Sequence, residues 1–192
     1  MRAPAQEAQD ATADLRSDDE LMLLARGGSG AAFDALVQRH QGRVLGVAAR
    51  HLGRSDLAPD VAQNTFVQIY RSLPRYQPRG KFMAFLYCVL LSQCRMAQRS
   101  AWVERHALGE AALLPSDTPD GPDEQILARE RQRGVESAVR KLSEKLRTVI
   151  LLRYSAGLDY QTIAEVLGLP LGTVKRRLFD GVEKLRQKME EP

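Results

Sequence analysis

Apolar residues recur at intervals of three and four along residues 18–106, which is the spacing of one buried face of an α-helix. The first run, DDELMLLARGG, is followed after a glycine-rich break by a longer one, AAFDALVQRHQGRVLGVAARHL. A third run stops at Pro74 and repeats apolar residues and one threonine at steps of four: Val61, Thr65, Ile69 and Leu73. A fourth, KFMAFLYCVLLSQCRMAQRS, is apolar at first and then becomes basic and polar. We predict that this part of the chain is a bundle of helices.

The helical spacing returns between residues 124 and 188, and no segment alternates in the manner of a β-strand. Residues 124–142 have a helical pattern, and Ser143 can cap the next helix, EKLRTVILLRY. One face of that helix collects four apolar or aromatic residues: Leu146, Val149, Ile150 and Tyr154. The predicted fold class is therefore all-α, with two helical domains.

The stretch GLDYQTIAEVLGLPLGTVKRRLFDG contains the signals of two helices joined by a tight turn. Gly157 ends the preceding helix, and Asp159 can cap the first of the two. The segment GLP, residues 168–170, makes the turn, because proline is tolerated where a helix begins. The second helix has one apolar stripe, formed by Val174, Leu178, Val182 and Leu185. The pattern predicts a C-terminal helix-turn-helix.

Between the two helical parts, residues 107–125 have a composition that opposes both a helix and a core. They contain five acidic residues and three prolines but no lysine or arginine, so they cannot hold a helix throughout and have little to bury. We interpret them as a flexible acidic linker between domains of residues 18–106 and 126–192. A disordered active-site loop is the alternative, but no catalytic group of residues flanks it. Residues 1–17 are polar and acidic, and we expect them to be disordered.

The 192-residue chain has a formal net charge of +4, which favours an anionic partner without identifying it. Residues 71–106 contain seven lysines and arginines and one acidic residue. No segment has the roughly 18 apolar residues of a membrane span, and the N-terminus has no hydrophobic signal core, so we expect a cytoplasmic protein. Cys88, Cys94 and three scattered histidines match no metal-binding or redox motif. We therefore expect no metal, no cofactor, no small-molecule substrate and no catalysis.

Basic residues are concentrated at the start of the second helix of the helix-turn-helix. In DNA-binding proteins of this type, the N-terminal residues of that helix enter the major groove. Arginine can hydrogen bond to guanine edges there, and lysine or threonine can hold phosphates. A bundle helix with a solvated charged face is the alternative interpretation. We expect the DNA contacts from five residues: Thr173, Lys175, Arg176, Arg177 and Phe179.

The wider C-terminal sequence, LSEKLRTVILLRYSAGLDYQTIAEVLGLPLGTVKRRLFDGVEKLR, resembles a domain of extracytoplasmic-function (ECF) sigma factors, the one that reads the −35 promoter element. Within it, the segment GTVKRRL has the signature residues of that family. A response-regulator output domain shares the general helix-turn-helix. Its receiver domain, however, would need alternating strands and helices, which residues 17–106 lack.

The N-terminal domain adds a second resemblance to the same family. The sequence DLAPDVAQNTFVQIYRSLPRY resembles the sigma-factor segment that binds the clamp helices of the largest subunit of core RNA polymerase. Asn64 replaces a usual acid, which should weaken electrostatic steering more than packing. The resemblance implies that core polymerase is bound by Asp56, Asp60, Gln63, Asn64 and Phe66.

In that family, the loop RYQPRGKF and the helix after it capture the non-template strand of the −10 element. Unpaired DNA requires a basic groove along its backbone and platforms or pockets for its bases. Tyr76 is the stacking candidate in the loop, whereas we assign Phe85 to the core. The family usually has a tryptophan near Phe85, so its base preferences do not transfer to this chain. The implied −10 contacts are Arg75, Tyr76, Arg79, Lys81, Gln93, Arg95, Gln98 and Arg99.

The resemblance covers residues 18–100 and 135–188 and implies an alternative sigma factor with no chemistry of its own. The implied partners are core RNA polymerase, promoter DNA and an anti-sigma factor that sequesters the protein. Three alternatives remain. One is a stand-alone helix-turn-helix regulator that binds duplex DNA without polymerase, and another is a sigma-like adaptor that binds polymerase but no promoter. The third, an enzyme acting on nucleic acid, would need clustered carboxylates or a nucleophile with a base, whereas the acids lie in the tail, the linker and one helix face.

Asp180 is the unusual residue of the predicted recognition helix, because the family commonly has a basic residue there. Its carboxylate can accept a hydrogen bond from cytosine N4, or it can pair with Lys184 one turn further along the helix. We favour the surface pair, because an isolated acid near phosphates is costly.

Overall fold

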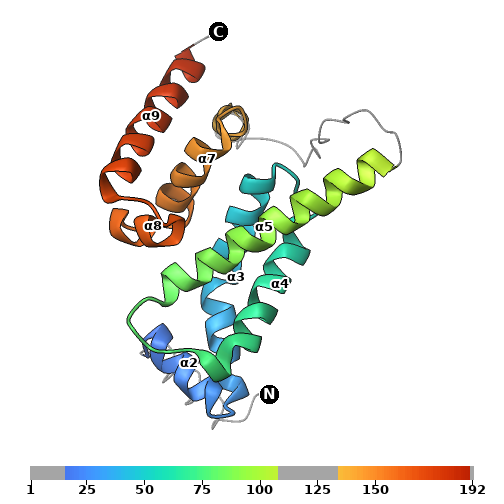
Figure 1. The fold of residues 1–192 in the computed structure, drawn as a ribbon, viewed down its shortest axis with the longest axis vertical. Helices are drawn as coiled ribbons and strands as arrows, with labels where there is room; N and C mark the ends of the chain where they lie inside the picture. The colour runs from blue at the N-terminus through green and yellow to red at the C-terminus, as the bar shows by residue number, and fades with distance from the viewer. Residues whose placement is uncertain (1–15, 108–133, 191–192) are drawn as a thin grey trace, which may run out of the picture.

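The computed structural model describes residues 16–107 and 134–190, and within these ranges every regular element is a helix. The helices form two groups (Figure 1), one from the N-terminal part of the chain and one from the C-terminal part. The predicted all-α fold is therefore confirmed. The predicted linker, residues 107–125, lies outside the described residues except at its first position, and so do residues 1–15 of the predicted tail.

The N-terminal group contains α2 (Asp18–Arg26), α3 (Gly30–Leu52), α4 (Ala58–Ser72), the short 3-10 helix η1 (Leu73–Arg75) and α5 (Phe82–Ala107). Ser17 begins α2 with a capping box: the Glu20 N–H donates to the Ser17 hydroxyl, and the Ser17 N–H donates to the Glu20 carboxylate. Ser17 is therefore fixed as the N-cap of the first helix.

The periodic stripe predicted for α4 is confirmed by burial. Val61, Thr65, Ile69 and Leu73 are all at most 5% exposed, and they face the core formed with α3 and α5. Thr65 lies inside this core without an orphaned hydroxyl, because its Oγ1 donates to the Val61 carbonyl oxygen at 2.7 Å. The polar member of the stripe is thus satisfied within its own helix.

The C-terminal group contains helical residues 134–140, α7 (Glu144–Ile150), the π-helical turn η2 (Leu151–Ser155), α8 (Tyr160–Leu167) and α9 (Leu171–Glu190). Asp159 caps α8 as predicted, since its Oδ1 accepts a hydrogen bond from the Thr162 N–H at 2.7 Å. Ser143 occupies the cap position of α7, but its side chain makes no capping hydrogen bond. Ser143 is therefore the N-cap residue of α7, but its hydroxyl does not cap the helix.

Tyr154 does not join the buried face that the sequence predicts for it. Leu146, Val149 and Ile150 are buried, whereas Tyr154 is 67% exposed. The cause is η2, in which the Ala156 N–H donates to the Leu151 carbonyl oxygen instead of continuing the α-helical pattern. A π-turn adds a residue to the turn and so changes the phase of the helix, which rotates Tyr154 towards solvent.

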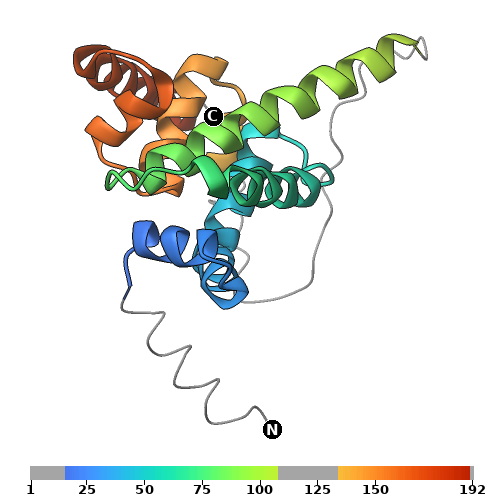
Figure 2. The same cartoon turned by 60° about the horizontal axis from the view of Figure 1, so that its bottom comes forward.

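The two groups of helices pack against each other. Figure 2 shows α8 beside the first half of α5, whose C-terminal half projects beyond the other helices. α8 contacts α5 and η2 contacts α3, so the buried apolar residues of both groups form one cluster. A Lys81–Glu165 ion pair at 2.8 Å and a hydrogen bond from the Cys88 thiol to the Val166 carbonyl oxygen at 3.4 Å cross this contact. No helix in the described ranges is long and apolar enough to cross a membrane.

His51 is buried where the two groups meet. It is 2% exposed, near the C-terminal end of α3, and its Nδ1 has no hydrogen-bond partner among the described residues. The charged groups that act on it are Arg147 and Glu144 of α7 and Arg95 of α5. Burial, followed by the positive charge of Arg147, lowers the pKa of His51 to about 4. Protonating His51 therefore opposes the packed state.

We predict that lowering the pH from 7 to 5 reduces the free energy of unfolding by about 2 kcal/mol through the titration of His51. The folded-state pKa of about 4 lies below the value near 6.5 of an unfolded chain. As the pH falls, the unfolded state therefore binds the proton first. Stability is full above pH 6.5, decreases towards pH 4 and has no further loss from this group below that.

Urea denaturation at pH 7 and pH 5 measures this loss. His51→Gln should remove it, whereas His106→Gln, a matched change at an exposed histidine, should retain it. Equal pH dependence in the wild type and both variants would contradict the assignment.

Candidate polymerase and nucleic-acid interfaces

The second helix of the helix-turn-helix, α9, is held against α7 by a stripe that differs from the predicted one. Val174 and Leu178 are buried as expected, but Val182 is 43% exposed. Gly181 takes the inward position instead, and a Cβ atom built there would lie 3.0 Å from Ile150 Cγ1. With 3.6 residues per turn, spacings of four and then three keep the stripe on one face. The prediction of Val182 as a core residue was therefore wrong.

The turn before α9 exposes the basic start of this helix. Gly168 adopts φ +61°, a left-handed conformation that favours glycine, and it ends α8 with hydrogen bonds from its N–H to the Ala164 and Glu165 carbonyl oxygens. Beyond the turn, Phe179 is 72% exposed and the Arg176 side chain 85% exposed. All five predicted −35 residues lie on α9, with Lys175, Arg176 and Phe179 exposed and Thr173 and Arg177 half-buried.

Asp180 pairs with a residue other than the predicted Lys184. Its Oδ2 lies 3.9 Å from Nε of Arg176, one turn earlier in α9. The pair lies on the surface, where such ion pairs contribute roughly 0–1 kcal/mol. The pair therefore adds little to stability, but it places a carboxylate beside Arg176, one of the residues predicted to contact DNA.

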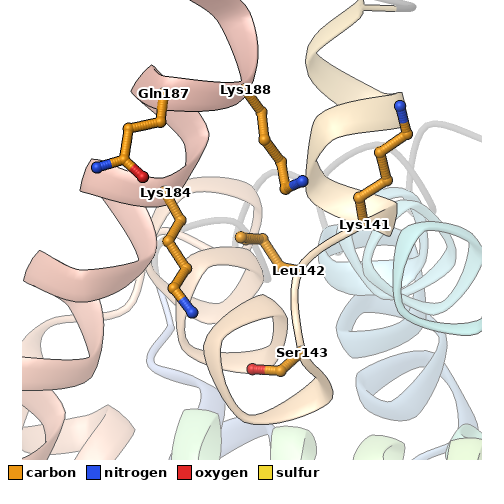
Figure 3. Close-up of a pocket in the computed structure, with 6 residues that line it drawn as sticks. All are labelled: Lys141, Leu142, Ser143, Lys184, Gln187 and Lys188. Carbon is orange, nitrogen blue, oxygen red and sulfur yellow. The ribbon is translucent and has the colours of Figure 1, made fainter. Parts of the chain in front are cut away.

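Behind the exposed face of α9 lies an open hollow of about 350 Å³ between its C-terminal half and the turn that precedes α7 (Figure 3). Its lining combines three ammonium groups with one hydroxyl, one amide and a leucine: Lys141, Leu142, Ser143, Lys184, Gln187 and Lys188. The hollow contains no carboxylate and no paired base and nucleophile. Among residues 16–107 and 134–190, no group of three His, Cys, Asp or Glu residues is placed to hold a metal ion.

The predicted polymerase-binding residues divide between the surface and the core. Asp60, Gln63 and Asn64 are exposed on α4. Asp56 is also exposed, just before α4, and its hydrogen bonds from Arg54, the shorter at 2.6 Å, lower the pKa of its carboxyl group. Phe66 is only 8% exposed and packs in the core. Its side chain is therefore packed against the other helices, whereas the four polar residues are at the surface.

The same exposed face of α4 continues into two residues that sequence reasoning missed. Val67 is 36% exposed and Tyr70 57% exposed, and Tyr70 makes an edge contact with Phe33 of α3. Together with Asp60, Gln63 and Asn64, they follow steps of three and four along the helix. Applying the helical period to the solvent face as well as the core face would have found them.

Tyr76 is packed in a way that prevents its ring from stacking on a DNA base. The side chain is only 9% exposed, its hydroxyl donates to Asp19 Oδ1 at 2.7 Å, and its ring lies 5.7 Å from that of Phe85. The prediction of Tyr76 as a stacking platform is therefore wrong for this conformation, because its ring is used for packing. Phe85 packs against the core as assigned.

The other predicted −10 residues form a line and not a pocket. Arg75, Arg79 and Lys81 are exposed at the loop before α5, and Arg95 and Arg99 are exposed further along α5, whereas Gln93 and Gln98 are half-buried. Residues 81 and 95 are 14 positions apart, which is about 20 Å along a helix. These five exposed basic side chains, here called the basic track, are therefore spread over at least this distance, and the one at residue 81 is paired with Glu165 of α8.

Exposed apolar side chains accompany this track on the projecting half of α5, and sequence reasoning missed them too. Met96 is 60% exposed, Trp102 54% and Val103 52%. The Trp102 ring lies 3.9 Å from that of His106. The sequence signal for them is that apolar residues occur here on more than one face of the helix, which a helix packed on one side would not bury.

Two packed helical domains, the second a helix-turn-helix with a basic, exposed second helix, define a DNA-binding protein. Family models for Sigma-70 region 2 and for Sigma-70 region 4 match residues 36–104 and 132–185. The ECF RNA polymerase sigma-E factor of Haemophilus influenzae is 32% identical over 185 residues, which are 91% of this chain and 96% of that protein. The chain belongs to the ECF sigma factor family, whose members direct transcription initiation by RNA polymerase and act as regulators, not as enzymes.

Two further proteins are similar to this chain over most of its length. The RNA polymerase sigma-H factor of Pseudomonas aeruginosa is 29% identical over 181 residues, which cover 90% of this chain and 94% of that protein. CnrH, solved in complex with the cytosolic domain of CnrY, has a TM-score of 0.69 and 29% identity, covering 90% of this chain and 97% of that one. The resemblance read from the sequence is therefore confirmed for the family and for its fold.

We predict that Gly181→Val destabilises the protein by about 1–3 kcal/mol, because the added methyl groups collide with buried Ile150. Gly42→Val is the matched control, since Gly42 also lies within a helix but a Cβ there meets nothing within 4 Å. Urea denaturation of both variants measures the difference. Equal stability would contradict the assignment of Gly181 to the α7–α9 contact.

Proposed function

We propose that this sigma factor uses three surfaces in turn. The exposed face of α4 binds the clamp helices of core RNA polymerase, the start of α9 reads the −35 element, and the loop before α5 with the exposed side of α5 holds the unpaired −10 strand. The domains that carry these surfaces are residues 18–106 and 126–192, joined by the acidic linker of residues 107–125. The observation that carries the proposal is that the basic residues at the start of α9 are exposed, while the apolar residues on the other side of the same helix are buried and hold it in place.

The chemistry of each surface suits its partner. Carboxylates and amides on α4 can pair with basic residues of a partner helix. Arginine and lysine on α9 can contact guanine edges and phosphates in the major groove. Basic side chains along α5 can follow the backbone of a single strand, and binding unpaired bases favours the open state of the promoter. The protein contributes binding energy and no bond-making step.

The two domains must separate for both promoter elements to be engaged. Elements about 25 base pairs apart lie roughly 80 Å apart along duplex DNA. Lys81 is paired with Glu165, and only five residues lie between Glu165 and the first residue of α9. The start of α9 therefore lies within about 30 Å of Lys81 in the packed arrangement. Breaking the Lys81–Glu165 pair also frees Lys81 for DNA.

We also propose that a cytoplasmic anti-sigma domain sequesters this protein. The support is the solved complex of the similar protein CnrH with the cytosolic domain of CnrY. A small partner domain that covers the polymerase-binding or DNA-binding surfaces would block initiation without any change in the sigma factor's own chemistry.

Run-off transcription with core polymerase on genomic fragments tests the function as a whole. We expect promoter-specific transcripts only when core polymerase and this protein are both present. Specific nanomolar binding of duplex DNA by the free protein would instead indicate a stand-alone regulator. Polymerase binding without any transcript would indicate an adaptor.

For the α4 surface, we predict that Asp60→Arg weakens binding to core polymerase by about tenfold or more, because it replaces an attractive charge with a repulsive one. Asp34→Arg is the matched control, since Asp34 is also exposed but lies on α3. Fluorescence titration with labelled protein measures the affinity. Equal losses in the two variants would show a general charge effect, and unchanged affinity in Asp60→Arg would contradict the proposed surface.

For α9, we predict that Arg176→Ala relaxes base preference within the −35 element, with a loss of about 1–3 kcal/mol at one base pair. Asp180→Ala should leave the preference unchanged, because its exposed pair with Arg176 is weak and Arg176 keeps its guanidinium group. Lys188→Ala is the control on the same helix, in the hollow behind the reading face. Selection of −35 sequences by holoenzyme measures all three. A relaxed preference at one base in Asp180→Ala would instead assign the carboxylate to cytosine.

A further inference from the structure

The loop of residues 76–81 is fastened to α2 by three hydrogen bonds, although the two segments are at least 50 residues apart in sequence. Oδ1 of Asp19 accepts from the Tyr76 hydroxyl at 2.7 Å and from the Arg79 N–H at 3.1 Å. Nη1 of Arg26 donates to the Tyr76 carbonyl oxygen at 3.0 Å. Both ends of α2 therefore hold the same short stretch of backbone.

α2 is itself firmly placed, so it can serve as a fixed support. Leu21 and Met22 are 0% exposed. Asp18, next to Asp19, accepts a hydrogen bond from Arg39 of α3 at 2.6 Å, and its other oxygen lies 3.0 Å from His40 Nε2. A displacement of Asp19 would thus require α2 to move against α3.

Apart from these three bonds, the loop is held at its two ends, where the Tyr76 N–H donates to the Leu73 carbonyl oxygen and Lys81 pairs with Glu165 of α8, and by one bond within itself, from Arg79 to the Gln77 side chain. Its residues from Gln77 to Lys81 are exposed and belong to no helix, and Gly80 adopts φ +67°. Such segments are mobile unless side chains fix them. Tyr76 supplies the fixed point: its ring packs on Phe85 at the start of α5, while its hydroxyl and carbonyl groups bind α2.

We propose that Asp19 and Arg26 are positioning residues for −10 recognition: they hold the loop in the shape that presents Arg79 and Lys81 to the unpaired strand. The inference rests on the proposed role of this loop in binding −10 DNA. A loop that is already ordered loses less conformational entropy on binding. It also holds its basic groups in one register on the strand backbone, which fixes where the unpaired bases lie against the protein surface that reads them. Tyr76 acts through this support and does not touch DNA.

The test is Asp19→Ala in the full-length protein with core polymerase. We expect open-complex formation, followed by permanganate reactivity of unpaired thymines, to fall about tenfold, and the base preference across the −10 element to flatten. Core-polymerase affinity and −35 preference should stay as in the wild type, because α4 and α9 are not involved. Asp19→Asn should restore most of the opening, since its amide oxygen can accept the same two hydrogen bonds. Asp34→Ala, at an exposed acid on α3, is the control.

Arg79→Ala separates this inference from the function on which it rests. If Arg79→Ala impairs opening but Asp19→Ala leaves opening and −10 preference unchanged, the positioning role is overturned. If neither variant affects opening, the loop does not bind the −10 strand and the proposed function of this surface fails as well. Should Asp19→Ala not fold, Arg26→Met probes the same support, because methionine has no donor for the Tyr76 carbonyl oxygen. A −10 preference that remains sharp in that variant overturns the inference.

Discussion

The burial of one half of α5 is the constraint on which the rest of the molecule depends. Leu86, Tyr87 and Leu90 are 0% exposed, and α3, α4 and α8 all pack against this helix. Each large apolar side chain buried in this way contributes about 1.5–3 kcal/mol. The remaining half of the same helix projects beyond its neighbours. A single rigid rod thus joins the core of the protein to the basic and apolar side chains that we assign to the −10 strand.

The contact between the two domains combines apolar packing with weak polar links. The Lys81 and Glu165 side chains are 58% and 29% exposed, so solvent screens their ion pair, and such pairs contribute roughly 0–1 kcal/mol. The buried, uncharged His51 adds a polar group that packing must keep desolvated. These features suit a contact that holds the free protein compact and opens when polymerase and promoter offer larger surfaces to each domain.

Local patterns in the sequence predicted the helices, and they also predicted which helix carries most of the residues that we assign to binding. The steps of four in α4, the cap at Asp159 and the glycine turn at 168 each act within one or two helical turns, so their outcome depends on few distant partners. The basic start of α9 and the exposed polar residues of α4 were predicted for the same reason. Where local geometry changed, the prediction failed: the π-turn η2 rotated Tyr154 to the surface, and Gly181 replaced Val182 in the packed stripe.

The sequence by itself determined the all-α class, the family and the residues available to meet DNA and polymerase, because helical periodicity and short motifs are local properties. Only the tertiary structure decided which of them are free to do so. Tyr76 looked like a stacking platform but became part of the core, while Asp19 and Arg26, which no motif marked, became its support. Phe66 likewise turned inwards, and Lys81 met Glu165 of the other domain. The physical reason is that the contacts of Tyr76 with α2 and of Lys81 with Glu165 join residues 50 or more positions apart, and their geometry is set by how whole helices pack, not by the order of neighbouring residues.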